Sequence, residues 1–261
     1  SIGDSLFSII RENKNYFTVE AITCNKNITK LLKLANEFNV KSIGFNSNKL
    51  KSKNMRNLNN FKLYDNINKF GEMVTKRTNV IIFAISGIEP MNLLLQVAKS
   101  KKKIGIANKE CIISLGNNLE SISKKYKSQI IPLDSEHNSI FHLLKEENSQ
   151  FSSITITASG GPFLNHNLNK LSKVTPQEAL KHPIWKMGKK ISVDSSTLMN
   201  KALEIIEAKY LFNLDTDQIN AIIHPQSIVH AMINYKNGIS KALLYNPDMR
   251  VPISSLFFDF D

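Results

Sequence analysis

The stretch Ile-Ile-Pro-Leu-Asp-Ser-Glu, residues 130–136, leads from an apolar run into two carboxylates separated by one residue. The apolar part predicts a buried strand that ends near Leu133. In an extended segment, residues two apart point the same way, so Asp134 and Glu136 would share one space at the strand end. Like charges that close are unfavourable unless a cation or a shared proton separates them. One interpretation is a site for Mg²⁺ or Mn²⁺, which prefer oxygen ligands; the other is a solvated strand end. The stretch alone favours the solvated end, and the rest of the chain favours the metal site.

Strand-like and helical segments alternate through the first half of the chain. Strands are predicted at 18–23, 42–45, 79–85, 103–107 and 129–133, and helices at 4–12, 28–38, 91–97 and 110–126. Residues 48–78 are rich in Asn and Lys and predict no clear element. The alternation indicates an α/β fold with a parallel, doubly wound sheet.

The pattern changes after about residue 150. A strand is predicted at 153–157, a short extended segment at 191–193 and a helix at 195–212. Two strands at 227–235 and 239–244 flank Asn237-Gly238, a strong hairpin signal. Between the strand at 153–157 and the extended segment at 191–193, residues 160–190 form a long polar connection. Because such loops are uncommon inside compact domains, we expect this segment to be a flexible lid.

Composition narrows the classes of partner. The formal net charge of +12 suggests an anionic partner, but the lysines are scattered and do not form an aromatic-interleaved stripe, so we do not expect nucleic-acid binding. A phosphorylated small molecule needs few of these cations. No apolar run approaches the ~20 residues of a membrane span. Two cysteines make no disulfide framework, which indicates a reducing compartment.

The predicted helix at 195–212 carries polar side chains at helical spacing. Asp194 or Ser195 is the expected N-cap. The apolar positions expected to pack inward are Leu198, Met199, Ala202, Leu203, Ile206 and Leu211. On another face lie Thr197, Asn200, Lys201 and Glu204. This face is either exposed, with a Lys201–Glu204 ion pair, or functional. In the functional case Ser195, Asn200 and Lys201 donate to a phosphate near the helix start, and Glu204 adds a third carboxylate to the metal site.

Two further segments are candidates for ligand contacts. Ser159-Gly160-Gly161 follows a strand, and paired glycines let backbone amides approach an oxyanion, although plain turns of this kind are common. The segment His-Pro-Ile-Trp-Lys-Met-Gly, residues 182–188, is either a loop anchored by Trp185 or a lid that closes over a ligand.

Two lysines lie at predicted strand ends. Lys109 follows a strand at the sheet edge where ligands bind in open parallel sheets, so a ligand contact is favoured over a surface position. Lys26 follows the predicted strand at 18–23, where a basic residue suits the extra phosphate of NADP. One lysine in a lysine-rich chain is a weak signal.

The ordered motifs resemble those of the 1-deoxy-D-xylulose-5-phosphate reductoisomerase family. They are Ala-Asn-Lys-Glu at 107–110, Pro-Leu-Asp-Ser-Glu-His-Asn at 132–138, Ser-Gly-Gly-Pro-Phe at 159–163, His-Pro-Ile-Trp-Lys-Met-Gly-Lys-Lys-Ile-Ser-Val-Asp-Ser at 182–195, Met-Asn-Lys-Ala-Leu-Glu at 199–204, His-Pro-Gln-Ser-Ile-Val-His at 224–230 and Pro-Asp-Met-Arg at 247–250. The resemblance covers essentially the whole chain. Of the family's glycine-rich first turn only Ser1-Ile2-Gly3 is present, and the family's C-terminal helical domain is absent after residue 261. Cys111 stands where Ser is usual, and Ala158 where Gly is common.

The resemblance implies a Rossmann-like NADPH-binding domain, N-terminally incomplete, at 1–130, and an α+β catalytic domain at 131–261. It implies conversion of 1-deoxy-D-xylulose 5-phosphate to 2-C-methyl-D-erythritol 4-phosphate for isoprenoid synthesis, with NADPH and Mg²⁺ or Mn²⁺. The ketose phosphate would rearrange by retro-aldol and aldol steps, and NADPH would reduce the resulting aldehyde. It also implies a homodimer without membrane or nucleic-acid partners, in the bacterial cytoplasm or an organelle such as a plastid.

The resemblance also implies a role for each site residue. The metal ligands are Asp134, Glu136 and Glu204, which with Lys109 and His182 are the expected catalytic residues. The phosphate contacts are Ser159, His182, Ser195, Asn200 and Lys201, while Lys109 and Ser135 contact substrate hydroxyls and Trp185 covers the substrate. The NADPH contacts are Ser1, Ile2, Asn25, Lys26, Asn27, Asn108, Glu110, Met187 and Gly188.

Two other classes stay open. One is a metal-dependent sugar-phosphate lyase or aldolase, which would keep the acids and the phosphate contacts but would not bind NADPH. The other is a folded, inactive fragment that only binds ligands.

Overall fold

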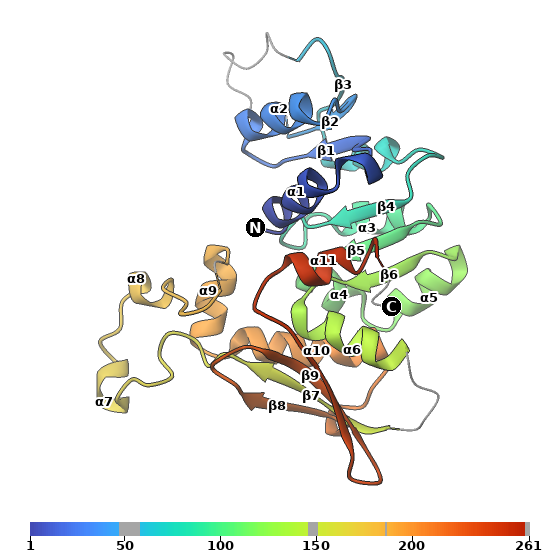
Figure 1. The fold of residues 1–261 in the computed structure, drawn as a ribbon. Coiled ribbons are helices and arrows are strands. Elements are labelled where there is room, and N and C mark those ends of the chain that lie inside the picture. Colours follow the sequence, from blue (N-terminus) through green and yellow to red (C-terminus); the bar gives the residue numbers. More distant parts are fainter. Residues whose placement is uncertain (47–57, 146–150, 186, 259–261) are drawn as a thin grey trace.

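The computed structural model describes residues 1–46, 58–145, 151–185 and 187–258 (Figure 1). The predicted α/β fold is confirmed, with parallel sheets in the first half of the chain and a mixed sheet in the second. None of the helices in these ranges is long and apolar enough to cross a membrane.

The described part of the first half contains six short parallel strands. Strands β1 (Ala21–Thr23), β2 (Ser42–Gly44) and β3 (Lys62–Tyr64) pair in that order, as do β4 (Val80–Phe83), β5 (Lys103–Ile106) and β6 (Gln129–Pro132). The side chains of Ile43, Ile104 and Ile106 are fully buried, as strands covered on both faces require. Strand β3 lies in the segment at 48–78, for which the sequence predicted no element; residues 48–57 of that segment lie outside the described residues.

The helices of the first half are α1 (Ile2–Glu12), α2 (Ile28–Glu37), α3 (Met91–Ala98), α4 (Lys109–Leu115) and α5 (Asn118–Tyr126), with 3₁₀ turns at Lys14–Tyr16 and Ile67–Met73. The single helix predicted over 110–126 is therefore wrong. The chain breaks at Gly116, whose φ is +51°, a conformation that glycine adopts without steric cost. A Cβ there would also lie 3.4 Å from the Tyr210 ring.

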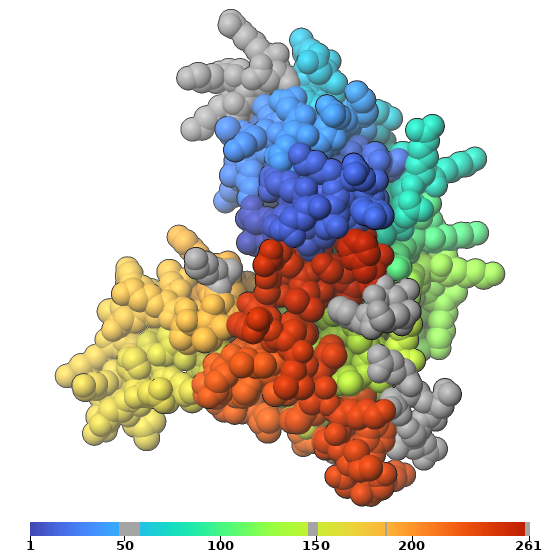
Figure 2. Space-filling model, viewed as in Figure 1, coloured from blue at the N-terminus to red at the C-terminus, as the bar shows by residue number. Residues whose placement is uncertain are grey.

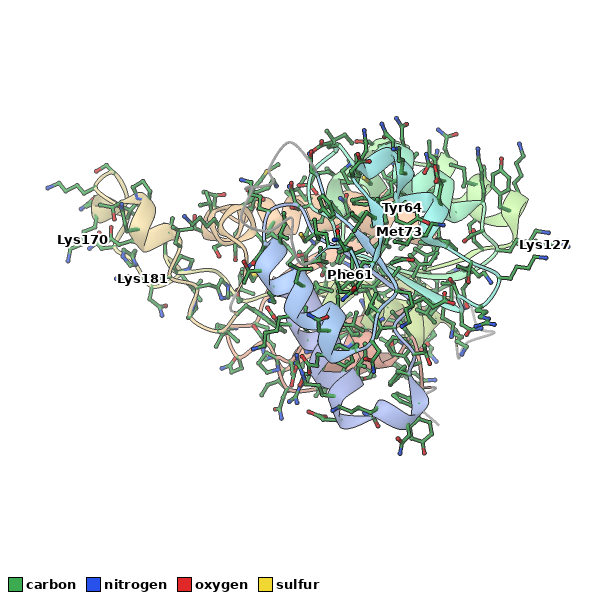
Figure 3. The ribbon with its side chains drawn as sticks, turned by 90° about the horizontal axis from the view of Figure 1, so that it is seen from above. Phe61, Tyr64, Met73, Lys127, Lys170 and Lys181 are labelled. Atoms are coloured by element: carbon green, nitrogen blue, oxygen red, sulfur yellow. The ribbon has the colours of Figure 1, made fainter. Side chains whose placement is uncertain are left out.

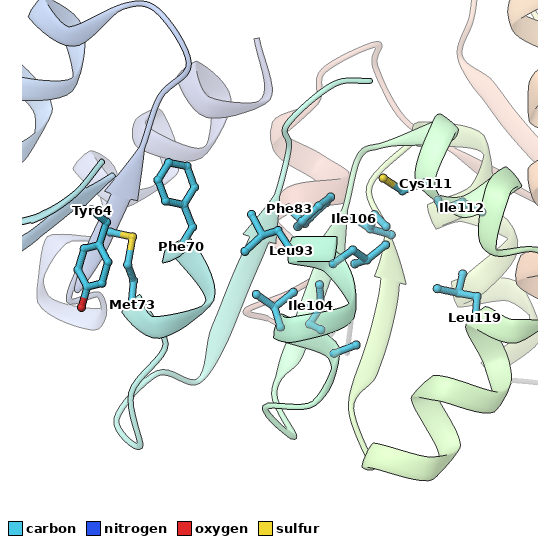
Figure 4. Close-up of a cluster of buried hydrophobic side chains, with 13 residues drawn as sticks. Tyr64, Phe70, Met73, Phe83, Leu93, Ile104, Ile106, Cys111, Ile112 and Leu119 are labelled. Carbon is cyan, nitrogen blue, oxygen red and sulfur yellow. The ribbon is translucent and has the colours of Figure 1, made fainter. Parts of the chain in front are cut away.

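An apolar core joins α3, α4 and α5 to the strands (Figure 4). Phe83, Ile104 and Ile106 of the strands pack with Leu93 of α3 and Ile112 of α4. Burial of each such side chain contributes about 1.5–3 kcal/mol to the stability of the fold. This packing fixes the carboxyl ends of β5 and β6, from which Lys109 and Asp134 follow.

The second half contains a mixed sheet with strand order β10-β9-β7-β8. The strands are β7 (Phe151–Ala158), β8 (Ile219–Ile223), β9 (Val229–Tyr235) and β10 (Ser240–Leu244). The predicted hairpin around Asn237-Gly238 is confirmed as β9 and β10, whereas β8, after a 3₁₀ turn at Thr216–Gln218, was not predicted. Helices α6 (Ser135–Lys145) and α10 (Met199–Phe212) contribute to one apolar core with this sheet.

The segment before α10 differs from the sequence prediction. Residues 191–193 are not extended but belong to α9 (Lys189–Ser196), and the predicted helix at 195–212 is two helices. Leu198 separates them in a left-handed conformation with a φ of +60°. Ser195 therefore lies in the last turn of α9, so the expected N-cap at Asp194 or Ser195 is wrong.

Residues 164–181 extend away from the rest of the described molecule (Figures 1 and 2). They hold the short helices α7 (Leu168–Leu171) and α8 (Pro176–Ala179). Viewed from above, Lys170 and Lys181 lie far from Tyr64 and Met73 of the first half (Figure 3).

Helix α11 (Arg250–Ser254) returns the chain to the first half. Ile253 and Leu256 are fully buried in a cluster with Ile9 of α1 and Leu133 after β6. The stretch that carries Asp134 therefore packs against residues from the beginning and from the end of the described chain.

Candidate active site

Carboxylates from two segments meet at the carboxyl edge of the parallel strands. Asp134 follows β6, Glu136 lies in the first turn of α6, and Glu204 projects from α10. One ligand oxygen from each lies within 4.8 Å of the other two. Their convergence agrees with the sequence prediction, but the expected extended geometry is wrong, because helix α6 begins at Ser135.

Helix α10 buries its charged face. Lys201, Glu204 and Glu207, spaced three residues apart, are 7%, 1% and 1% exposed. The expectation that the apolar side chains of the predicted helix at 195–212 pack inward is wrong for four residues, which are exposed: Leu198, Met199, Ala202 and Ile206. The interpretation as an exposed ion pair is therefore excluded. Glu207 was not among the predicted residues, although its position one turn after Glu204 was a usable signal.

Two lysines lie among the four acids. The Nζ of Lys201 lies 2.7 Å from Oε1 of Glu136 and also pairs with Glu204. The Nζ of Lys109 pairs with Asp134 and lies 3.1 Å from Oε2 of Glu207 and 3.4 Å from Oε1 of Glu204. Both ammonium groups thus contact the carboxylates directly.

The charges of this cluster are unbalanced. When all four carboxylates are ionised, they face two ammonium groups, which leaves two negative charges in a largely buried site. Burial and the neighbouring Glu204 charge raise the pKa of Glu136 to about 7, and burial raises the pKa of Glu207. Burial opposes ionisation of Asp134 too, but the Lys109 ammonium outweighs it and holds the pKa of Asp134 below its usual range. A divalent cation would balance the residual charge, and an all-oxygen donor set suits Mg²⁺ or Mn²⁺.

His137 lies beneath this cluster and was not predicted as a site residue. Its Nε2 donates to the carbonyl oxygen of Glu204 over 2.9 Å. Its Nδ1 lies 3.8 Å from both Asp134 and Glu207, so these three residues form a second group with metal-ligand spacing. Because Mg²⁺ and Mn²⁺ prefer oxygen ligands and the second group includes a histidine nitrogen, we favour the oxygen triad of Asp134, Glu136 and Glu204 as the cation site.

The Ser159 turn and His182 form a polar pair beside α9. The Nδ1 of His182 accepts from the amides of Ile184 and Trp185 over 3.2 and 2.9 Å, so Nε2 carries the proton and donates to Oγ of Ser159 over 2.8 Å. Burial lowers the pKa of His182, which agrees with a neutral ring. The Ser159 hydroxyl proton therefore remains available to an anion.

Gly161 brings this turn against the end of α9. Its φ is +70°, and a Cβ would lie 2.5 Å from the carbonyl oxygen of Ser195. Only glycine fits this close approach, which places Ser159 near Ser195. From the sequence we expected an anion at a helix start near Ser195. Since α10 begins at Met199, the helix start with amides suited to an anion is the one that carries Asn200 and Lys201.

One cleft of about 2410 Å³ connects these groups. Of the residues predicted from sequence, it is lined by Ser1, Ile2, Asn27, Asn108, Lys109, Glu110, Asp134, Ser135, Glu136, Ser159, His182, Trp185, Met187, Gly188, Ser195, Asn200, Lys201 and Glu204. Asn25 and Lys26 do not line it. The Asn108 side chain caps α4 by accepting from the amide of Cys111 and donates to the Gly87 carbonyl oxygen, so it is committed to the fold.

His230 and Tyr245 also border the site and were not predicted. Their rings stack with centroids 3.7 Å apart, and the Trp185 ring meets His230 edge-on at 6.3 Å. Burial lowers the pKa of His230 to about 4; the charges of Lys201 and His224 act in the same direction, and the Tyr245 carbonyl and Asp134 oppose them.

We expect His230 to make the folded state less stable in acid. The unfolded chain would bind a proton near the ordinary pKa of about 6.5, whereas the folded ring stays neutral down to about pH 4. The free energy of unfolding should therefore rise with pH across this window. In urea titrations, His230→Asn should reduce that rise by on the order of 1–2 kcal/mol, less than the full shift because the cleft admits water. His166→Asn, on an exposed turn, is the matched control; equal pH slopes in wild type and His230→Asn would contradict the assignment.

The fold and the site define a class: a nucleotide-binding α/β enzyme that works with a divalent cation. Residues 1–116 match the family model for 1-deoxy-D-xylulose 5-phosphate reductoisomerase, and residues 130–212 match the model for its C-terminal domain. The enzyme of that name from Pelagibacter ubique is 42% identical over 268 residues, which cover 100% of this chain and 69% of that protein. The Wolbachia pipientis wMel enzyme is 41% identical, covering 97% and 66%. The chain belongs to the 1-deoxy-D-xylulose 5-phosphate reductoisomerase family.

Solved structures agree with this assignment. A crystal structure of DOX-P reductoisomerase in complex with NADPH, fosmidomycin and magnesium has a TM-score of 0.91 and 33% identity, covering 100% of this chain and 68% of that one. The Zymomonas mobilis enzyme in complex with NADPH has a TM-score of 0.85 and 32% identity, covering 98% and 67%. This chain thus spans about two thirds of the length of these relatives.

Proposed function

We propose that this protein converts 1-deoxy-D-xylulose 5-phosphate to 2-C-methyl-D-erythritol 4-phosphate, with NADPH and Mg²⁺ or Mn²⁺. The observation that carries the proposal is the buried oxygen cluster at the carboxyl edge of a parallel sheet, in one cleft with the start of α1 and the Ser159 turn. Asp134, Glu136 and Glu204 would hold the cation. When bound, the cation supplies Lewis-acid stabilisation of substrate oxyanions and NADPH supplies the hydride.

The side chains around the cluster orient the substrate hydroxyls and bind the substrate phosphate. Lys109 and Ser135, beside the cation ligands, orient the substrate hydroxyls. Ser159, with its proton free to donate, joins Ser195, Asn200 and Lys201 at the phosphate, and His182 fixes the orientation of Ser159. Anchoring the phosphate away from the reacting carbons holds those carbons in place for the rearrangement.

NADPH is proposed to bind in the part of the cleft that the first half of the chain lines. Ser1 and Ile2 stand at the start of α1, where backbone amides and the helix dipole suit a pyrophosphate. Asn27 and Glu110 also line the cleft, and Met187 and Gly188 approach it from the segment before α9. Asn25 and Lys26, next to Asn27, are proposed to reach the ribose phosphate from the rim.

The activity is tested by following NADPH oxidation by the complete gene product with 1-deoxy-D-xylulose 5-phosphate and Mg²⁺. Oxidation should require both the sugar phosphate and the cation, and the product should keep all five carbons. Release of smaller carbonyl fragments without NADPH oxidation would instead identify a lyase. Binding of NADPH and Mg²⁺ without turnover would support the binding-only alternative.

We propose that residues 160–190 are a lid over this site. Their short helices stand away from the body, and Leu168 is 81% exposed, so few buried contacts hold the segment (Figure 1). Hydrogen exchange should be fast there without ligand and slower when the sugar phosphate and Mg²⁺ are bound, while α10 stays protected in both states. Equally strong protection of 160–190 in both states would contradict a lid.

The finer properties that the family implies are part of the same proposal. We propose a homodimer in the cytoplasm or an organelle. Ile222 and Ile223 on β8 and Leu244 on β10 are 44%, 45% and 55% exposed, and exposed apolar edge strands are surfaces for association. Sedimentation equilibrium would decide the oligomeric state.

A further inference from the structure

We propose that Glu207 is a positioning residue that keeps the Lys109 ammonium in the site when the cation is bound. The inference rests on the proposed function, because it assigns Asp134, Glu136 and Glu204 to the cation. It gives a role to an acid that lies in the same cleft but outside that triad.

Glu207 occupies a costly position. It lies one helical turn after Glu204 on the buried face of α10, and its side chain is 2% exposed. A carboxylate is rarely buried without a partner, since removing the charge from water is unfavourable. Its Oε2 lies 3.1 Å from Lys109 Nζ and 3.8 Å from His137 Nδ1. Of these two, the Lys109 ammonium is within hydrogen-bonding distance.

The other acids around Lys109 have a competing role. Asp134 pairs with Lys109, and Glu204 Oε1 lies 3.4 Å from its Nζ. Both are proposed cation ligands, and oxygens that coordinate a dication have less electron density to offer an ammonium. The cation also repels Lys109 directly. Glu207 is the acid in this cluster that is free of the cation, so it retains Lys109 against that repulsion.

The placement of Lys109 explains why this matters. Lys109 begins α4, shortly after β5 ends, and its long side chain reaches Glu207 on α10. Without an anchor on α10, the ammonium could leave the substrate hydroxyls for solvent at the mouth of the cleft. Glu207 thus links the strand edge of the first half to the helix that carries the phosphate contacts.

The test compares Glu207→Gln, which keeps the shape and removes the charge, with Glu204→Gln and with Glu120→Gln on an exposed surface. Glu207→Gln should lower kcat/KM by about 10- to 100-fold, as loss of an outer-shell partner commonly does. Its Mn²⁺ affinity should stay near that of wild type, whereas Glu204→Gln should lose Mn²⁺ binding. Glu207→Asp should recover part of the activity. Loss of Mn²⁺ affinity in Glu207→Gln would make Glu207 a ligand, through the Asp134–His137–Glu207 group, and overturn the proposal.

A double variant separates positioning from a general structural role. If Glu207 acts through Lys109, Lys109→Met with Glu207→Gln should be no less active than Lys109→Met alone. Losses that multiply, or wild-type activity in Glu207→Gln, would overturn the proposal. The double variant removes both members of the buried pair, so it remains informative if Glu207→Gln alone does not fold.

A crystal structure of the Mg²⁺-loaded wild type tests the inference without turnover. Lys109 Nζ should remain hydrogen-bonded to Glu207, and in Mg²⁺-loaded Glu207→Gln it should be displaced. Lys109 turned away from Glu207 in the wild type would reject the proposal. If the wild type binds Mg²⁺ but does not turn over the sugar phosphate, the proposed function fails, and this structure still decides the role of Glu207.

Discussion

Glu204→Gln is expected to weaken Mn²⁺ binding by more than about 100-fold, beyond the ~10- to 100-fold range typical of outer-shell changes. Glu204 is the central acid of the cluster: it is 1% exposed, and its carboxylate lies close to those of both Asp134 and Glu136. Gln keeps the size of the side chain but offers the cation one neutral amide oxygen in place of the two oxygens of a charged carboxylate. Turnover should fall with cation affinity, because the reaction needs the Lewis acid.

Three measurements decide this prediction. Mn²⁺ titration gives the cation affinity, NADPH titration shows that the cofactor half of the cleft is intact, and thermal unfolding shows that the fold is kept. Glu120→Gln, an exposed acid on α5, should match wild type in all three. Unchanged Mn²⁺ affinity in Glu204→Gln would reject the oxygen triad as the cation site. It would favour the second group with metal-ligand spacing, which is Asp134, His137 and Glu207.

The elements with strong local signals were predictable from the sequence. The buried strand before Asp134 and the hairpin at Asn237-Gly238 follow from an apolar run and from turn chemistry. Short-range pattern did not reveal where helices break. The left-handed residue between α9 and α10 is Leu198, which carries no glycine-like signal, so two helices were predicted as one.

The site shows a similar division. Glu204 was proposed from the polar face of its helix and then from the family motif at 199–204, whereas Glu207 stands outside that motif. A helix with charged residues three apart usually presents them to solvent. Its buried partner is Lys109, which begins α4 and lies 98 residues earlier in the chain. Partners so distant in sequence become visible only when the sheet edge and α10 are brought together. The convergence of Asp134 and Glu136 was predicted, but by the wrong geometry, because Ser135 begins a helix.

Lys201→Met is expected to have three effects of different sign. An exposed Lys201–Glu204 pair would matter little, but Lys201 is 7% exposed and pairs with both Glu136 and Glu204. Leaving the buried Glu204 and the partly buried Glu136 carboxylates without this partner should cost about 3–5 kcal/mol of stability in the cation-free protein. Loss of a charge-assisted contact should also weaken binding of the sugar phosphate by about 1.5–3 kcal/mol. Affinity for Mn²⁺ should rise, because the ammonium no longer competes for the same oxygens.

Adding Mg²⁺ separates the effect of Lys201→Met on stability from its effect on substrate binding. If Lys201 neutralises the acids that bind the dication, Mg²⁺ should restore most of the stability lost in Lys201→Met, but it should not restore affinity for the sugar phosphate. Thermal unfolding with and without Mg²⁺ and calorimetric titration of the sugar phosphate measure the two effects separately. Lys124→Met, which removes an exposed ammonium paired with Glu120, is the matched control. Substrate affinity that stays at the wild-type value would reject the phosphate role of Lys201, and stability that Mg²⁺ fails to restore would show that the lysine and the cation do not share the carboxylates of Glu136 and Glu204.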